Sequence, residues 1–466
     1  MRRAAAALLL GAALAGCTLG PDYRRPAVPA PETWRQASAG TDPASLADLG
    51  WWELFEDPEL RALVQAALEA NRDLRVAVAR VEQARALLGV ARAGQFPQVG
   101  AGAGATTNRV SDTVEPRGFG GESDRFTTTL DLSFEIDLWG RLRRATEAAR
   151  AELLAAEEAR RTVVMTLVSD VAVSYLALRQ LDLELETTRR NLASRERSLQ
   201  LVRDRFEAGL TSALDLRQAQ AELASTAAQI PDLERQIAQT EHRLSVLLGR
   251  PPGPIARGRP LTGQLFPPEV PAGLPSALLE RRPDIRQAEA ALVAANARIG
   301  VARAAFFPQI SLTGLFGVES AALSDLFTGP SRVWQFGPAV TLPIFTAGRN
   351  RANLALAEAR QREALARYEQ VIQQAFREVE DALVAHRQAR RALAEQAAAV
   401  QAAREALRIA EDRYTSGLAN YLSVLDAQRT LLAAEVAESR TLLARLVAVV
   451  QLYRALGGGW EIGPPE

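Results

Sequence analysis

Apolar and polar residues alternate at every second position in one stretch of the chain. From Phe126 to Leu138, Phe, Leu and Ile occupy one set of positions, and mainly Thr, Ser and acidic residues occupy the other. A period of two separates the two faces of a β-strand. The run covers about 13 residues, which exceeds the usual soluble strand and suits a tilted transmembrane strand. A half-buried strand of a soluble sheet would also alternate, so that alternative stays open.

A second stretch repeats the pattern, with these residues in phase: Trp334, Phe336, Val340, Leu342 and Ile344. A Gly- and Ala-rich segment with a much less clear pattern precedes each run, and both segments start after a Phe-Pro-Gln sequence that ends a helical pattern. We therefore predict two β-hairpins, at about 97–138 and 308–345. Trp139 and Trp334 occupy positions typical of the aromatic girdles of membrane barrels.

Each predicted hairpin is followed by a very long helical pattern. Apolar residues recur there every three or four positions, as in coiled coils. The patterns predict helices at about 141–207 and 349–415, each roughly 100 Å long. Each helix ends at a Gly-Leu turn, after which a return helix begins. No compact domain contains a helix of that length.

The two halves of the chain form an internal repeat. Phe96-Pro97-Gln98 matches Phe307-Pro308-Gln309 at an offset of 211, and Gly209-Leu210 matches Gly417-Leu418 at an offset of 208. The repeat organises the chain into these segments: 1–16, a signal peptide; 17–57, an N-terminal periplasmic or equatorial segment; 58–248, the first repeat, opening with a helix at about 58–94; 249–283, a surface linker or equatorial segment; 284–457, the second repeat; and 458–466, a C-terminal tail.

The N-terminus has the form of a secretory signal. Two arginines precede an apolar run of about 12 residues, too short to span a bilayer as a helix. The run ends in Leu14-Ala15-Gly16-Cys17, which resembles a bacterial lipobox. We expect cleavage before Cys17 and acylation of this residue, the only cysteine of the chain. A chance cysteine near an ordinary cleavage site is the alternative.

Composition removes most other functional classes. Basic and acidic residues are equal at 55 each, which argues against a nucleic-acid partner. The sequence contains no lysine, two histidines and one cysteine, so phosphate-binding loops, Schiff bases, His/Cys metal clusters and Cys–His dyads have no candidates. We therefore expect no enzyme activity, no cofactor and no metal site.

Four predicted strands cannot close a barrel, and lipid does not tolerate open sheet edges. The chain must therefore oligomerise. Three copies would supply about 12 strands, a size known among outer-membrane barrels.

The sequence resembles outer membrane factors of the TolC type, and more closely the NodT-family lipoproteins of resistance-nodulation-division efflux systems. The motifs that carry the resemblance cover essentially the whole mature chain: Gly20-Pro21-Asp22-Tyr23, Leu54-Phe55-Glu56-Asp57-Pro58, Glu135-Ile136-Asp137-Leu138-Trp139-Gly140-Arg141, Glu280-Arg281-Arg282-Pro283-Asp284, Leu425-Asp426-Ala427-Gln428, and Ala455-Leu456-Gly457-Gly458-Gly459-Trp460.

The resemblance implies a mainly helical homotrimer with a 12-stranded β-barrel, four strands per chain, that continues into a long periplasmic α-helical barrel. It implies a lipid-anchored outer membrane protein that is the passive exit duct of a tripartite efflux pump. The implied partners are a periplasmic adaptor, also called a membrane fusion protein, an inner-membrane resistance-nodulation-division transporter and outer membrane lipid.

The resemblance also assigns roles to residues near the helix turns. Asp426 and Asp215 align with acids that ring the closed end of the channel, where clustered carboxylates would attract cations and bind divalent ions. Tyr414 aligns with a tyrosine linked to the gate. Ordinary alternatives are an N-cap for Asp215 and helix packing for Tyr414.

Adaptor contacts are implied at the two turns themselves. Gly209 and Gly417 also fit helix C-caps with positive φ, and Leu210 and Leu418 would be exposed apolar contacts.

On the first hairpin, Asp131, Glu135 and Asp137 share the polar side of the alternation and would face a wet pore lumen.

Two other functions remain as alternatives. A type I protein-secretion duct would share the same architecture. A periplasmic adaptor or structural coiled-coil lipoprotein would have a single helical hairpin inserted in β-rich domains.

Overall fold

The structure is a computed structural model that describes residues 18–35, 45–111, 121–266 and 271–461 of the chain. The expected signal peptide and Cys17 lie outside these residues. The strands are β1 (Gln98–Val110), β2 (Gly121–Ile136), β3 (Gln309–Ser320) and β4 (Arg332–Thr341). The helices are α2 (Trp51–Leu54), α3 (Pro58–Ala70), α4 (Arg72–Ala93), α5 (Arg141–Glu207), α6 (Ala213–Ala227), α7 (Gln229–Leu247), α8 (Leu278–Arg281), α9 (Pro283–Ala304), α10 (Arg349–Thr415) and α11 (Tyr421–Ala455), with short 3-10 turns η1 (Leu46–Asp48), η2 (Leu261–Gly263), η3 (Pro275–Ala277), η4 (Leu323–Asp325) and η5 (Gly329–Ser331).

The chain forms two compact units, and each draws on both halves of the sequence repeat. The sheet unit comprises Met1–Ala27, Arg80–Glu157 and Gln287–Glu369. The core unit comprises Val28–Ala79, Glu158–Arg286 and Gln370–Glu466. The helices α5 and α10 occupy the residues at which the sequence predicts the two long helices, and both run through the two units.

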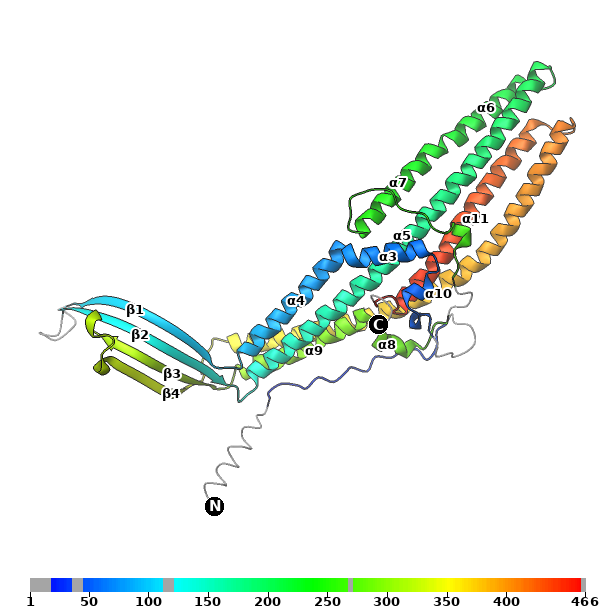
Figure 1. Ribbon diagram of the computed structural model, residues 1–466. Coiled ribbons are helices and arrows are strands. Elements are labelled where there is room, and N and C mark those ends of the chain that lie inside the picture. The colour runs from blue at the N-terminus through cyan, green and yellow to red at the C-terminus, as the bar shows by residue number, and fades with distance from the viewer. Residues whose placement is uncertain (1–17, 36–44, 112–120, 267–270, 462–466) are drawn as a thin grey trace. The chain divides into compact units, whose positions relative to one another are not determined.

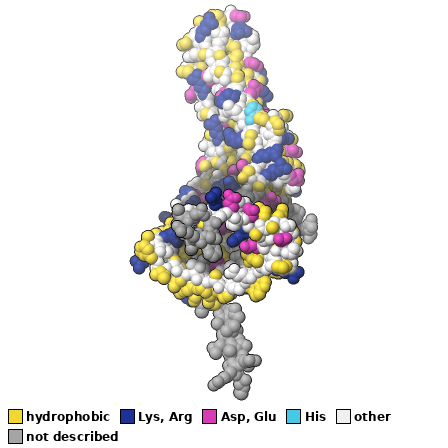
Figure 2. Space-filling model, turned by 90° about the vertical axis from the view of Figure 1, so that its left-hand side faces the viewer, with side chains coloured by type: hydrophobic (Ala, Val, Ile, Leu, Met, Phe, Trp, Pro, Cys, Tyr) yellow, Lys and Arg dark blue, Asp and Glu magenta, His cyan; other side chains and the backbone are white. Residues whose placement is uncertain are grey.

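The sheet unit contains one antiparallel sheet with the strand order β1-β2-β3-β4 (Figure 1). Its register gives the sheet one apolar face, which carries Val99, Ala101, Ala103, Ala105, Phe126, Leu130, Leu132, Phe134, Ile136, Ile310, Leu312, Phe316, Val318, Trp334, Phe336 and Val340. The opposite face is mainly polar and includes Asp131, Ser133, Glu135, Thr313, Glu319 and Gln335. Apolar side chains gather along the outer margin of this end of the molecule in Figure 2.

The register also explains the Gly- and Ala-rich strand β1, which the sequence left without a clear pattern. Ala101, Ala103 and Ala105 lie on the apolar face, beside Leu130, Thr128 and Phe126 of β2. Glycines occupy the alternate positions on the polar face. Many apolar side chains of the sheet are open in the single chain, as the exposed fractions of Trp334 (71%) and Val99 (71%) show.

Some predicted boundaries were wrong. β4 ends at Thr341, so Leu342 and Ile344 follow the strand, and Asp137 lies just past the end of β2. The helix expected at 58–94 is broken at Asn71, because its side chain accepts a hydrogen bond from the amide of Leu74 and starts a new helix. The first return helix is also broken, near Ala228, since Pro231 cannot donate a helical hydrogen bond.

The core unit packs around the apolar stripe of α5. Val164, Val171, Tyr175 and Leu178 are at most 1% exposed, as the coiled-coil spacing predicts. Residues of α3, α7 and α11 join the same cluster. Within the described residues, α5 is the one helix with an 18-residue window apolar enough to cross a membrane, and 61% of that window is buried in the protein. Burial identifies this window as part of a core helix.

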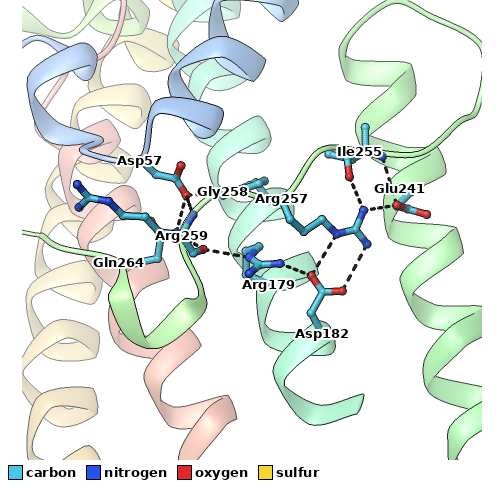
Figure 3. A network of polar contacts seen from close by, with 10 residues as sticks. Asp57, Arg179, Asp182, Glu241, Ile255, Arg257, Gly258, Arg259 and Gln264 are labelled. Carbon is cyan, nitrogen blue, oxygen red and sulfur yellow. Dashed lines mark hydrogen bonds and ion pairs between the residues drawn. The ribbon is translucent and has the colours of Figure 1, made fainter. Parts of the chain in front are cut away.

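The described part of the segment between the two halves is mainly exposed or half-buried, as a surface linker would be, but some of its apolar residues are anchored in the core. Ile255 (3% exposed) and Leu261 (1%) belong to the core cluster. Figure 3 shows the polar network that holds the segment: Arg257 pairs with Asp182 of α5 and with Glu241 of α7.

Asp57 is the most buried carboxylate of this region, at 1% exposed. It accepts hydrogen bonds from the Tyr175 hydroxyl (2.9 Å), the Gln264 amide (2.7 Å) and the backbone amides of Glu59 and Arg259. Burial alone would raise the pKa of Asp57, but these donors outweigh it and hold the pKa below its ordinary value. One side chain thus joins α3, α5 and the linker.

We expect Asp57→Asn to lower the apparent melting temperature of the purified protein at neutral pH. The amide loses the charge that strengthens four hydrogen bonds, a cost of about 1–3 kcal/mol. Because the folded-state pKa is depressed, the stabilisation is present above about pH 4 and lost as the pH falls through the folded pKa. The difference from the wild type should therefore shrink in acid.

Glu56→Gln is the matched control, since the neighbouring side chain is 49% exposed. Equal melting temperatures for the two variants would contradict the role assigned to Asp57.

Candidate functional site

The two turns that end α5 and α10 have the same geometry. In the first, the amide of Gly209 donates to Phe206 and the amide of Leu210 to Arg205; in the second, Gly417 donates to Tyr414 and Leu418 to Arg413. These pairs define Schellman motifs, which need a left-handed residue after the helix. Both glycines have φ of +73°, so the predicted helix caps are confirmed.

Each turn presents apolar side chains to solvent. Leu210 is 68% exposed and Leu418 is 71% exposed, and Leu214 and Leu422 nearby are 64% and 52% exposed. The described residues offer no cover for them. Two similar turns therefore carry similar apolar tips.

Asp215 caps α6, although not as its first residue. The N-cap is Ser212, and Asp215 is the third residue of a capping box: its amide donates to the Ser212 hydroxyl, and its carboxylate accepts from the Ser212 amide. The Thr211 hydroxyl donates to the same carboxylate at 2.5 Å. The capping alternative thus has direct support, but Asp215 lies three residues after the N-cap residue, Ser212.

Asp426 has a different environment. It lies in the second turn of α11, where its side chain is exposed. Among the described residues this carboxylate forms no hydrogen bond or ion pair; only its backbone oxygen accepts, from Thr430. Nothing in the described chain brings Asp426 and Asp215 together. Of these two acids, Asp426 is the one whose carboxylate has no hydrogen bond or ion pair among the described residues.

Tyr414 packs inside the helix bundle. It is 5% exposed in a cluster with Val202, Tyr421 and Val424. The guanidinium of Arg205 lies 4.9 Å from its ring centre. Its hydroxyl is buried without a hydrogen-bond partner in the described residues and borders a pocket of about 280 Å³. The ring of Tyr414 therefore lies where the helix-packing alternative predicts it.

A buried ion-pair network lies next to this cluster and was missed from the sequence. Glu222 of α6, with a side chain 9% exposed, pairs with Arg195 of α5 (2.7 Å) and Arg429 of α11 (2.5 Å). Burial would raise the pKa of Glu222, but hydrogen bonds from Arg429 and Arg195 hold it below its ordinary value. No local pattern could reveal the network, because it joins three helices.

The strand acids have three different environments. Asp131 is exposed on the polar face of the sheet and accepts a hydrogen bond from Thr129 (3.2 Å). Glu135, at the end of β2, pairs with Arg141 at 2.6 Å. Asp137 accepts from the amide of Arg143 (2.8 Å). It therefore caps the start of α5 and was wrongly placed on the strand.

The one apolar and one polar face of the sheet have the pattern of strands in membrane barrels. The sequence comparisons agree. Residues 63–250 and 274–458 match the family model described as outer membrane efflux protein. The chain belongs to this family of channel proteins.

Relatives and solved structures are similar over nearly their full length. The toluene efflux pump outer membrane protein TtgF of Pseudomonas putida is 42% identical, with 97% of this chain and 96% of the relative covered. "Probable outer membrane lipoprotein SilC" of Salmonella typhimurium is 39% identical, with 96% of each covered. The outer-membrane channel OprN matches at 35% identity with a TM-score of 0.89, over 95% of this chain and 100% of that one. The protein is an outer membrane efflux channel with a TolC-like fold.

We expect Glu222→Gln to destabilise the helix bundle by about 3–5 kcal/mol, because Arg195, only 4% exposed, would keep a buried charge without its partner. Amide hydrogen exchange along α6 should accelerate, and the melting temperature should fall. The pair replacement Arg195→Leu with Glu222→Leu should recover most of the loss.

The control is Glu186→Gln, which removes an exposed pair with Arg190 and should change little. Equal rates of amide hydrogen exchange along α6 in the Glu222→Gln and Glu186→Gln variants would contradict the role assigned to Glu222.

Proposed function

We propose that this channel is the exit duct of a tripartite efflux pump, in which a homotrimer conducts small molecules from the periplasm to the exterior. The observation that carries the proposal is the two-faced sheet. Its apolar face suits lipid, and its polar face suits a water-filled lumen containing Asp131 and Glu135.

The dimensions of the apolar face fit a membrane. The band runs on β2 from Phe126 to Ile136, ten residue steps. At about 3.3 Å per residue this is roughly 33 Å of strand. A strand tilted by about 40° crosses roughly 25 Å in that length, which is the height of the apolar band of outer-membrane barrels.

The sheet edges require more than one chain. β1 and β4 each have one neighbour among the described strands, so each leaves a row of backbone groups unpaired. Lipid offers these groups no hydrogen bonds. Because the number of strands is even, β4 of one copy is antiparallel to β1 of the next, and three copies give a closed barrel of 12 strands.

The N-terminal segment supports a lipid anchor at Cys17. Thr18 packs against Gly140, next to the end of β2, so closely that a Cβ on Gly140 would lie 2.7 Å from it. The Leu19 amide donates to Trp139, and Asp22 pairs with Arg144 at 2.7 Å. Thr18, which directly follows the residue we expect to be acylated, thus lies close to the end of β2.

The helix turns are the proposed docking and gating region. Leu210 and Leu418, presented by Gly209 and Gly417, would contact a periplasmic adaptor that links the duct to an inner-membrane resistance-nodulation-division transporter. Asp426 would line the constriction three times around the axis. Asp215 would contribute less, since its carboxylate is held by Thr211 and Ser212.

The two alternatives have less support. TtgF is named as a component of an efflux pump, which favours small molecules over secreted proteins. An adaptor with a single helical hairpin does not fit a chain with two hairpins and one continuous four-stranded sheet.

We expect cysteines on the two sheet edges to link different copies. Substitutions at Ala101, Ala103 or Ala105 of β1 would be combined with substitutions at Trp334, Phe336 or Val340 of β4. Oxidation should give disulfide-linked dimers and trimers for the pairs in register, visible in denaturing gels. Leu130→Cys on β2, combined with the same β4 variants, is the control and should give no cross-link, because β3 separates the two strands within a copy and β1 would separate them between copies.

No intermolecular disulfide from any edge pair, in folded protein, would contradict closure between copies.

We expect Asp426→Asn to weaken block by divalent cations about a hundredfold in planar-bilayer recordings. A carboxylate about 4 Å from a cation contributes on the order of 1 kcal/mol in water, and a trimer loses three of them. Asp215→Asn should change block less. Asp412→Asn, which removes an exposed acid already paired with Arg408, should match the wild type.

An unchanged block in the Asp426 variant would reject the gate assignment and leave the channel itself intact.

A further inference from the structure

The apolar face of the sheet ends in an arginine at the hairpin end of β4. Arg332 is the first residue of β4 and pairs with Val318 of β3. Strand alternation places it on the same face as Trp334 and Phe336, whose rings lie 6.3 Å apart. Arg332 is exposed, and Trp334 is 71% exposed. A cation and an indole therefore stand at one end of the apolar band.

This arginine differs from the other arginines near the sheet. Arg125 pairs with Glu319 on the polar face, and Arg141 pairs with Glu135 at the other end of the strands. For Arg332, the described residues provide no hydrogen bond or ion pair, and its nearest neighbours by register are Val318, Trp334 and Ser320. Its positive charge therefore has no partner among the residues that the structure describes.

The acidic residues on the same face are not neighbours of Arg332 in the sheet register. Glu122 and Asp124 lie on β2, two strands from β4. There Asp124 accepts a hydrogen bond from Thr107 at 2.6 Å, and Glu122 stands opposite Arg109.

The loop before Arg332 is ordered and presents apolar groups. The hydroxyls of Thr328 and Ser331 both donate to the backbone oxygen of Asp325 at 2.7 Å. The loop buries Leu326 but leaves Phe327 80% exposed and Leu323 63% exposed. Large apolar side chains held in the open at the end of a membrane face suit contact with lipid.

We propose that Arg332, Trp334 and the exposed side chains of this loop bind an outer-leaflet lipid that carries phosphate on its head group, such as lipid A. The guanidinium binds the phosphate through paired N–H donors. The indole lies at the level between head group and acyl chains, where aromatic belts occur, and Phe327 and Leu323 contact apolar parts of the lipid. The inference rests on the proposed insertion of the sheet in the outer membrane.

The test uses the full-length protein in detergent, with bound lipid counted by native mass spectrometry. The probes are bisphosphorylated lipid A, the same lipid without its phosphates, and inorganic phosphate. The wild type should prefer the phosphorylated lipid about fivefold, the factor that one exposed charge pair supplies. Arg332→Gln should remove this preference. Trp334→Ala should weaken the binding of both lipids to the same degree.

Arg125→Gln is the matched control, since Arg125 lies near the same end of the sheet but on the polar face. It should keep the preference of the wild type. The proposal is overturned if Arg332→Gln retains the preference, or if millimolar inorganic phosphate abolishes it, which would indicate a simple anion site. Channel conductance of the same samples separates the lipid site from the channel function. Protein that conducts but shows no preference for the phosphorylated lipid would contradict the lipid site and leave the proposed channel function standing.

Discussion

The backbone groups along the outer edges of β1 and β4 set the constraint on which the rest of the structure depends. A sheet with one apolar and one polar face can lie between lipid and water, but lipid cannot satisfy an open edge. The four strands of this chain leave two such edges. In the proposed trimer, other copies of the chain supply the rest of a closed surface. The apolar side chains that are open in one chain, such as Val99 and Trp334, would form the outer surface of that proposed barrel.

The same logic applies to the helices. An apolar stripe on α5 is buried by α3, α7 and α11, and charged pairs such as Glu222 with Arg195 and Arg429 fix how neighbouring helices meet. The segment between the repeats, held by Asp57 and Arg257, closes this core. Rigid long helices ending in two Schellman turns present paired apolar tips.

Local patterns in the sequence predicted much of this, and long-range contacts did not. Period-two alternation placed β2, helical spacing placed α5 and α10, and glycines before leucines placed both helix caps, because each of these depends on residues close in sequence. The face pattern of β1 emerged only from its register with β2, since Ala and Gly differ too little in polarity. Asp215 was assigned to the gate by resemblance, with a helix cap as the alternative, and Asp137 was assigned to the lumen face by strand alternation. In the structure both carboxylates accept hydrogen bonds from backbone amides at the start of a helix. The network of Glu222 joins residues 27 and 207 positions apart, and a single sequence does not reveal which helix faces meet.

Amide hydrogen exchange in β1 and β4, with the protein reconstituted in lipid vesicles, tests the central claim most directly. If the edges pair between copies, both strands should be protected to the same degree as the central strands β2 and β3, because every strand then has two neighbours. Exchange in β1 and β4 as fast as in the connecting loops, with β2 and β3 protected, would contradict a barrel closed between copies.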